Sequence, residues 1–173
     1  MIAPPMRYFF CLVFTLLSGV TAADDAKTEA DRILGVWATE KAEAHVEISR
    51  DESGYRGRIV WLKEPFYAAD DPDGMAGLAK MDRENPDPAL RNRHIDGLLI
   101  MEGFHYAGDG QWTGGTIYDP DNGETYSCKL WLTEDGSLKV RGYVGISLFG
   151  RTTEWTPVLV RASPPITDEQ NDS

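Results

Sequence analysis

Residue types that act as nucleophiles or general bases occur in this sequence, but their spacing does not form a catalytic motif. Ser127 and Ser147 lie outside any nucleophile-elbow pattern and have no triad context. His45, His94 and His105 are too widely separated to resemble a zinc site. The sequence therefore predicts no catalytic residue, no metal ligand and no cofactor.

Two acidic segments faintly resemble calcium loops. DDPDG at Asp70 to Gly74 and DPDNG at Asp119 to Gly123 each bring carboxylates together, but neither has the closing glutamate at the proper distance. Asp, Asn, Pro and Gly are also the residues that turns require. Both segments are therefore interpreted as turns.

Arg91 and Arg93 follow an Asp- and Pro-rich segment and are candidates for binding an anionic head group. Guanidinium groups bind the oxygens of carboxylates and phosphates in pairs. The alternative is internal ion pairing with Asp82, Glu84 or Asp87. Both interpretations remain open, and the first makes the two arginines candidate ligand-binding residues.

Aromatic side chains are the remaining candidates for a ligand-binding site. Strand parity places Trp112, Gly114, Thr116 and Tyr118 on one face, which is expected to point inward. The alternative is that these rings only fill a core, as aromatic residues usually do. The candidate ligand-binding aromatic residues are Trp61, Phe104, Trp112, Tyr118, Tyr126 and Tyr143.

The elements that would position these residues are strands, because apolar and polar residues alternate along short segments. Most of the connections are short and rich in Gly, Asp and Asn, as hairpin turns require. The predicted strands are Gly35 to Thr39, Ala44 to Ser49, Tyr55 to Lys63, Leu98 to Tyr106, Gln111 to Tyr118, Thr125 to Leu132, Leu138 to Tyr143 and Gly150 to Val158.

Sequential hairpins form a meander, and closing that meander removes both of its unpaired edges. Eight strands enclose an interior just wide enough for side chains or for one small ligand. The predicted fold is therefore all-β, an eight-stranded antiparallel up-and-down barrel, with a two-sheet sandwich as the alternative. The barrel domain spans residues 33–161, after a polar lead-in over 23–32 and before a tail, 162–173, that is expected to be disordered.

The connection over residues 64–93 is unusually long for a compact domain, which makes it either functional or partly helical. ALRNR within it is expected to form a short turn of helix. The loop is predicted to cover the barrel mouth and to place Arg91 and Arg93 at the rim. Its apolar side chains would pack on the opening: Phe66, Tyr67, Met75, Leu78 and Met81.

Gly35 and Trp37 form a G-x-W pattern that resembles the lipocalin signature, in which the tryptophan closes the barrel floor against an arginine. Three longer segments, NPDPALRNRHIDGL, WTGGTIYDPDNGETY and RGYVGISLFGRTTEW, resemble the secreted bacterial family of domain of unknown function 2147. That resemblance implies a lipocalin-like barrel and no agreed biochemical activity.

One position departs from the pattern of that family. Its last strand usually reads W-x-R, whereas here Trp155 is followed by Thr156 and Pro157. The arginine that packs against the floor tryptophan is therefore expected to be Arg161 or Arg151.

The N-terminal residues predict export. Arg7 precedes an apolar run from Tyr8 to Leu17, which is shorter than the roughly 20 residues that a bilayer-spanning helix needs. Val20 and Ala22 fit the rule for signal-peptidase cleavage, so residues 1–22 are interpreted as a signal peptide, with an uncleaved anchor as the alternative. The mature protein is expected to be periplasmic or secreted and to lack a transmembrane segment.

Cleavage would remove Cys11 and leave Cys128 without a partner in the chain. Cys128 shares a strand face with Tyr126, Leu130 and Leu132, so it is predicted to be reduced, buried and unreactive.

These observations favour a non-enzymatic protein that binds a small amphipathic molecule, such as a fatty acid or lipid fragment. The alternatives are an envelope protein-interaction module with a filled barrel and, third, an envelope hydrolase or isomerase. The net charge of -11 argues against nucleic acid or an anionic membrane as partner. The expected oligomeric state is a monomer or a weak homodimer.

Overall fold

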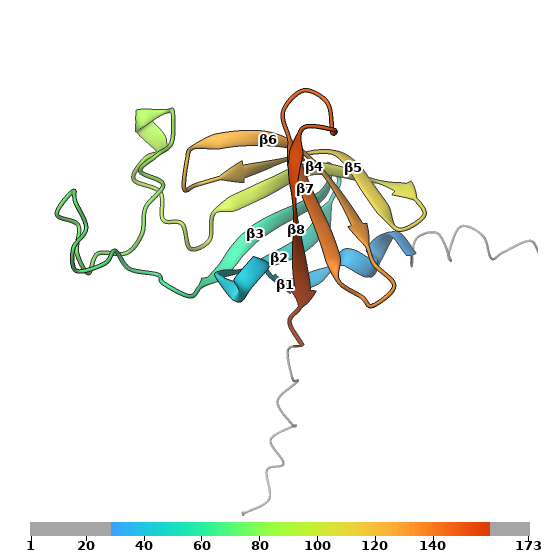
Figure 1. Ribbon diagram of the computed structural model, residues 1–173, viewed down its shortest axis with the longest axis horizontal. Coiled ribbons are helices and arrows are strands. Elements are labelled where there is room, and N and C mark those ends of the chain that lie inside the picture. Colours follow the sequence, from blue (N-terminus) through green and yellow to red (C-terminus); the bar gives the residue numbers. More distant parts are fainter. Residues whose placement is uncertain (1–28, 160–173) are drawn as a thin grey trace, which may run out of the picture.

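The computed structural model describes residues 29–159, which form a closed antiparallel barrel of eight strands in chain order (Figure 1). β1 pairs with β8 through Trp37 opposite Pro157 and Ala38 opposite Thr156, and this pairing closes the barrel. The predicted up-and-down barrel is confirmed, and the two-sheet sandwich is excluded.

The strand positions agree closely with the alternation of apolar and polar residues in the sequence. The strands are β1 (Gly35–Ala38), β2 (Ala44–Asp51), β3 (Gly54–Leu62), β4 (Leu99–Gly108), β5 (Gln111–Asp119), β6 (Glu124–Leu132), β7 (Leu138–Tyr143) and β8 (Gly150–Pro157). Three short 3-10 helices accompany them: η1 (Asp31–Ile33), η2 (Glu40–Ala42) and η3 (Pro88–Leu90). The helical turn expected at ALRNR occurs slightly earlier, as η3, where the Asp87 carboxylate accepts a hydrogen bond from the Ala89 N–H.

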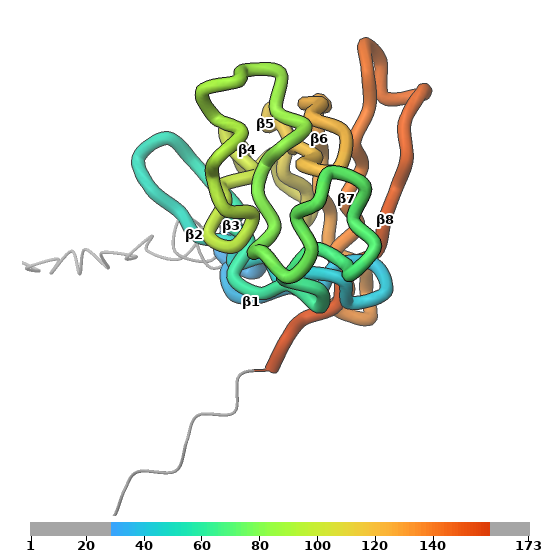
Figure 2. Tube along the Cα trace, turned by 90° about the vertical axis from the view of Figure 1, so that its left-hand side faces the viewer, coloured from blue at the N-terminus to red at the C-terminus, as the bar shows by residue number. Residues whose placement is uncertain are grey.

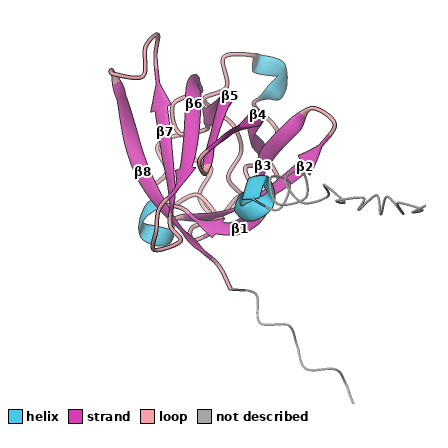
Figure 3. Cartoon of the chain, turned by 90° about the vertical axis from the view of Figure 1, so that its right-hand side faces the viewer, coloured by secondary structure: helices cyan, strands magenta, loops and turns pink. Residues whose placement is uncertain are grey.

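The segment around η1 closes one end of the barrel, which Figure 3 shows from the outside. Ile33 has no exposed surface and belongs to the core. The Trp37 indole N–H donates to the Ile33 carbonyl at 2.8 Å, and that of Trp112 donates to the Ala30 carbonyl at 3.1 Å. Two buried tryptophans therefore hold this segment on the barrel floor.

A bulge in β5 changes which residues of that strand face inward. Its register against β6 shifts between Trp112 and Gly115, and Gly114 has a positive φ of 81°. An extra residue in one strand reverses the side-chain alternation beyond it. Gly115 is consequently buried, while Gly114 and Thr116 are exposed. The prediction of one inward face that included Gly114 and Thr116 is therefore wrong.

A second irregularity turns Trp61 outward. His45 pairs with Trp61 but Val46 pairs with Ile59, so Val60 is the extra residue on β3. The Trp61 side chain is 42% exposed and stacks on His45 with ring centroids 4.4 Å apart. The predicted placement of Trp61 inside the barrel is therefore wrong.

Cys128 is a free thiol with no exposed surface on the inner face of β6, beside Leu130. Burial raises the pKa of its thiol from 9.0 to about 12. The predicted burial is confirmed, whereas the reactivity of the thiol remains a prediction.

We expect Cys128 to react very slowly with a thiol reagent at neutral pH in the native state, because the thiolate is the reactive form and is scarce. The rate at which Cys128 reacts with an aromatic disulfide is measured from the absorbance of the released thiol, on protein that lacks residues 1–22. A Ser127→Cys variant supplies an exposed thiol on the outer face of the same strand as the control. Native labelling of Cys128 as fast as that of the control would contradict the prediction.

Several predictions concern residues outside the described range. The signal peptide over 1–22, most of the lead-in over 23–32, the tail over 162–173 and Arg161 are all in this group. Within residues 29–159, no helix has the length and apolar character needed to cross a bilayer.

Candidate ligand-binding cavity

The barrel end opposite η1 contains a cavity of about 860 Å³. Its walls include the η2 turn, the end of β3, the β5–β6 turn and the β7–β8 hairpin. Figure 2 looks onto this end, with the 63–98 loop in front and the β7–β8 hairpin projecting beside it. Sites for small molecules usually occupy about 300–1,000 Å³, so the cavity is large enough for one.

The inner wall of the cavity is apolar. Inward-facing positions on different strands meet there because side chains alternate between the two faces of each strand. A surface of this kind stabilises a buried hydrocarbon by about 0.8 kcal/mol for each methylene. The apolar lining residues deep in the barrel are Val46, Ile59, Ile100, Ile117, Val140 and Trp155.

Three of the predicted aromatic residues line the cavity: Tyr118, Tyr126 and Tyr143. The Tyr126 hydroxyl accepts a hydrogen bond from the Asn122 amide at 3.0 Å. Among the described residues, no group hydrogen-bonds to the Tyr143 hydroxyl. Phe104 and Trp112, in contrast, are fully buried in the core and do not line the cavity.

Charged side chains surround the cavity opening. Arg151 contacts Glu40 at 2.6 Å, and Lys80 lies 3.9 Å from Glu64. Two further lysines line the cavity, Lys41 in η2 and Lys63 after β3, and both are exposed. In the part of the chain that the structure describes, no carboxylate lies within ion-pair distance of either lysine. These two ammonium groups can therefore interact with an anionic head group.

Sequence reasoning missed Lys41 and Lys63, because Lys41 lies in an irregular segment and Lys63 was only the last residue of a predicted strand. Their proximity depends on the pairing of β2 with β3, in which Ala44 is opposite Leu62. The Lys63 N–H also donates to the Glu43 carbonyl at 2.9 Å, which brings the two connections together.

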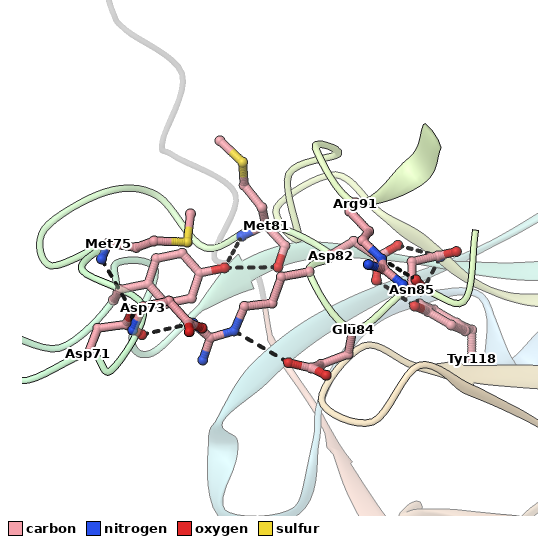
Figure 4. A network of polar contacts seen from close by, with 11 residues as sticks. Asp71, Asp73, Met75, Met81, Asp82, Glu84, Asn85, Arg91 and Tyr118 are labelled. Carbon is pink, nitrogen blue, oxygen red and sulfur yellow. Dashed lines mark hydrogen bonds and ion pairs between the residues drawn. The ribbon is translucent and has the colours of Figure 1, made fainter. Parts of the chain in front are cut away.

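Arg91 and Arg93, the predicted head-group ligands, do not line the cavity. Arg93 donates to the Asp82 carboxylate at 2.7 Å. Arg91 donates to the Asn85 carbonyl at 2.7 Å (Figure 4). The internal pairing of Arg93 with Asp82, one of the two open interpretations, is the one that the structure shows.

Asp82 is fully buried and connects the long loop to the cavity wall. Its carboxylate accepts hydrogen bonds from the Asn85 amide and from the Tyr118 hydroxyl, as well as from Arg93. Burial, followed by the hydrogen bond to Asp82, raises the pKa of Tyr118 to about 12. Tyr118 therefore remains a neutral donor at physiological pH, and this network fixes the loop against β5.

The long loop borders the opening but does not pack its apolar side chains onto it. Glu64 and Lys80 line the cavity, whereas Phe66 and Leu78 are 58% and 53% exposed. Tyr67 is buried within the loop, where its hydroxyl bonds to the backbone of Met81. The predicted apolar lid is therefore wrong, because the loop forms its own internal contacts.

The first of the two calcium-like segments contains an internal cation instead. The Arg83 guanidinium lies 2.9 Å from the Asp71 carboxylate and 3.1 Å from that of Asp73 (Figure 4). Among residues 29–159, no cluster of acidic, histidine or cysteine side chains could hold a metal ion.

Of the residues considered for the barrel floor, Trp37 and Trp155 are buried in the core, whereas Arg151 is not close to Trp37. Trp37 and Trp155 are each 4% exposed, and Gly35 begins β1 with a φ of 122°. Arg151 lies at the open end, where it pairs with Glu40. The expectation that Arg151 packs against Trp37 is therefore wrong.

Comparison with known proteins identifies a family model and a solved structure that are similar to this chain. A family model described as "Uncharacterized protein conserved in bacteria (DUF2147)" matches residues 35–157. A solved structure, described as "Protein HP1028 from the human pathogen Helicobacter pylori belongs to the lipocalin family", is 22% identical to this chain. The alignment covers 73% of this chain and 82% of that one, with a TM-score of 0.61. This similarity shows a lipocalin-like fold. No curated protein matches the sequence significantly.

Proposed function

This chain belongs to the DUF2147 family of uncharacterised bacterial proteins, and we propose that it is an exported, non-enzymatic binding protein for a small amphipathic ligand. A fatty acid or a lipid fragment has the required chemistry. The observation that carries the proposal is the cavity of about 860 Å³, which is apolar inside and surrounded by charged groups at its opening.

The free energy of burial explains why both parts of the cavity are needed. A ten-carbon chain gains roughly 8 kcal/mol from burial, against a cost of association of about 4–15 kcal/mol. Contacts with the head group must therefore supply the remainder. The ammonium groups of Lys41 and Lys63 are the cationic groups of the lining that have no ion-pair partner among the described residues.

The side chains that line the cavity favour binding over hydrolysis by a serine or cysteine nucleophile. Among the described residues that line the cavity, none is a histidine, a serine or a cysteine. A nucleophile with an adjacent base is the arrangement that hydrolysis by covalent catalysis requires. The signal-peptide pattern over residues 1–22 supports a site of action outside the cytoplasm.

We expect a fluorescent fatty acid to bind in the cavity and to be displaced by unlabelled fatty acids, with affinity that rises with chain length. A Lys41→Ala/Lys63→Ala variant should bind a fatty acid roughly tenfold more weakly, a loss of about 1.4 kcal/mol. It should bind the fatty alcohol of equal length almost unchanged, because the alcohol carries no charge.

Lys129→Ala is the matched control, since Lys129 lies near the Trp131 ring and does not line the cavity. Native mass spectrometry of the protein from its own host tests the same proposal without a chosen probe. Absence of both displacement and co-purified lipid would reject the carrier function in favour of a protein-interaction module.

A further inference from the structure

The tip of the β7–β8 hairpin exposes an unusual amount of apolar surface. Val144, Ile146, Leu148 and Phe149 are between 60% and 74% exposed. Residues 142–150 include no charged side chain. The hairpin projects away from the barrel in two perpendicular views (Figures 1 and 2). Contiguous exposed apolar side chains of this kind mark an interaction surface.

The hairpin holds these side chains in place. The Arg141 guanidinium donates to the carbonyls of Ser147 at 2.8 Å and Leu148 at 3.2 Å. It also donates to the Thr152 hydroxyl at 2.8 Å, which connects the two sides of the hairpin. Gly145 has a φ of 71°, a conformation that glycine adopts without strain. The backbone is thus fixed while the apolar side chains remain in solvent.

The tip is continuous with the cavity. Val144 and Phe149, at its two ends, both line the cavity wall, whereas Ile146 and Leu148 do not. An apolar surface therefore runs from the interior of the barrel over the opening to the exposed tip. A hydrocarbon chain can follow this surface without being transferred through water.

The charges at the base of the hairpin indicate a phospholipid surface. Arg141 and Arg151 flank the uncharged tip, and the Arg151 side chain is 78% exposed. An apolar tip with the exposed Arg151 guanidinium behind it matches the acyl region and the phosphates of a bilayer. The net charge of -11 disfavours a strongly anionic surface and so favours zwitterionic phospholipid.

We propose that the hairpin tip, residues 144–149, docks on the surface of a zwitterionic phospholipid bilayer and holds the cavity opening against it. The amphipathic ligand then passes between bilayer and cavity. The transfer step rests on the proposed function, whereas docking is measured independently of it.

Sedimentation with sucrose-loaded vesicles of phosphatidylethanolamine and phosphatidylcholine tests the docking step. The wild-type protein should sediment with the vesicles, and an Ile146→Ser/Leu148→Ser variant should bind about tenfold more weakly. Because neither residue lines the cavity, the variant should keep its affinity for the soluble fatty-acid probe. Phe66→Ser/Leu78→Ser, in the long loop, removes two similarly exposed apolar side chains and is the matched control.

Each other result has a definite consequence. Vesicle binding that survives Ile146→Ser/Leu148→Ser, or that falls equally in the control, overturns docking through the tip. Probe binding without vesicle binding overturns docking and leaves the proposed function intact, whereas vesicle binding without probe binding supports docking and rejects the carrier. Sedimentation velocity measures self-association of the protein. If Ile146→Ser/Leu148→Ser reduced self-association and left vesicle binding unchanged, docking on the bilayer would be overturned.

Discussion

Replacing Gly142 by phenylalanine is expected to block the cavity and prevent the binding of long-chain ligands. Gly142 lines the cavity and is outside the left-handed region of backbone conformation. A β-carbon at this position meets Tyr126 at 3.5 Å and Ile117 at 3.7 Å, which are ordinary contact distances. Both neighbours also line the cavity, so the added ring extends into the space that the ligand would occupy.

The expected loss depends on the length of the ligand. Each methylene that is excluded forfeits about 0.8 kcal/mol, so exclusion of four weakens binding by about 3 kcal/mol, or somewhat more than a hundredfold. Short chains lose less. Displacement of the fluorescent probe by fatty acids of increasing length measures this profile, and Thr156→Phe on the exposed face of β8 is the control. An unchanged profile would show that the ligand does not enter the barrel.

The barrel itself was predictable because its strands and turns follow local rules. β7 (Leu138–Tyr143) alternates apolar and polar residues, and the preceding turn contains Asp and Gly. Which residues of β5 point into the barrel was not predictable, since the strand contains adjacent glycines and the position of the bulge depends on the partner strand. Gly114 adopts the positive φ, while a β-carbon on Gly115 would collide with the Phe104 ring. The sequence alone does not show which glycine has which role.

The candidate site was predictable where strand parity survived and unpredictable where it depended on loops. Tyr126 reaches the cavity from the inner face of β6, on the same parity as Cys128. Tyr143 lines the opening from the end of β7, although strand parity places it opposite to Val140 and Gly142. The ion-pair partner of Arg93 could not be predicted because it depends on how the loop folds. Asp82 lies eleven residues earlier and contacts Arg93 only in the folded loop. Lys41 and Lys63 converge through strand pairing and carry no pattern of their own.

Trp112→Ala is expected to cause the largest loss of stability of any single change considered, because it empties the closed end of the barrel. The indole has no exposed surface and packs against Tyr106 with ring centroids 5.2 Å apart and edge-on against Tyr55 at 6.3 Å. Truncation of a buried tryptophan to alanine usually costs about 3–5 kcal/mol in the free energy of unfolding. It also leaves the Ala30 carbonyl without the hydrogen bond that the indole N–H donates to it.

Urea denaturation measures this loss, and two controls separate its causes. Trp112→Phe keeps a ring but removes the hydrogen bond, so it should cost less than the alanine variant, with about 1–3 kcal/mol from the unsatisfied carbonyl. Trp131→Ala, on a partly exposed side chain, should cost less still because that position is not buried in the core. Since Trp112 does not line the cavity, the Trp112→Ala protein that remains folded should bind the fatty-acid probe with nearly unchanged affinity. If the Trp112→Ala protein were as stable as the wild type, the Trp112 indole would not be what holds the floor around η1. If the folded Trp112→Ala protein lost affinity for the probe, the floor and the cavity would be energetically coupled.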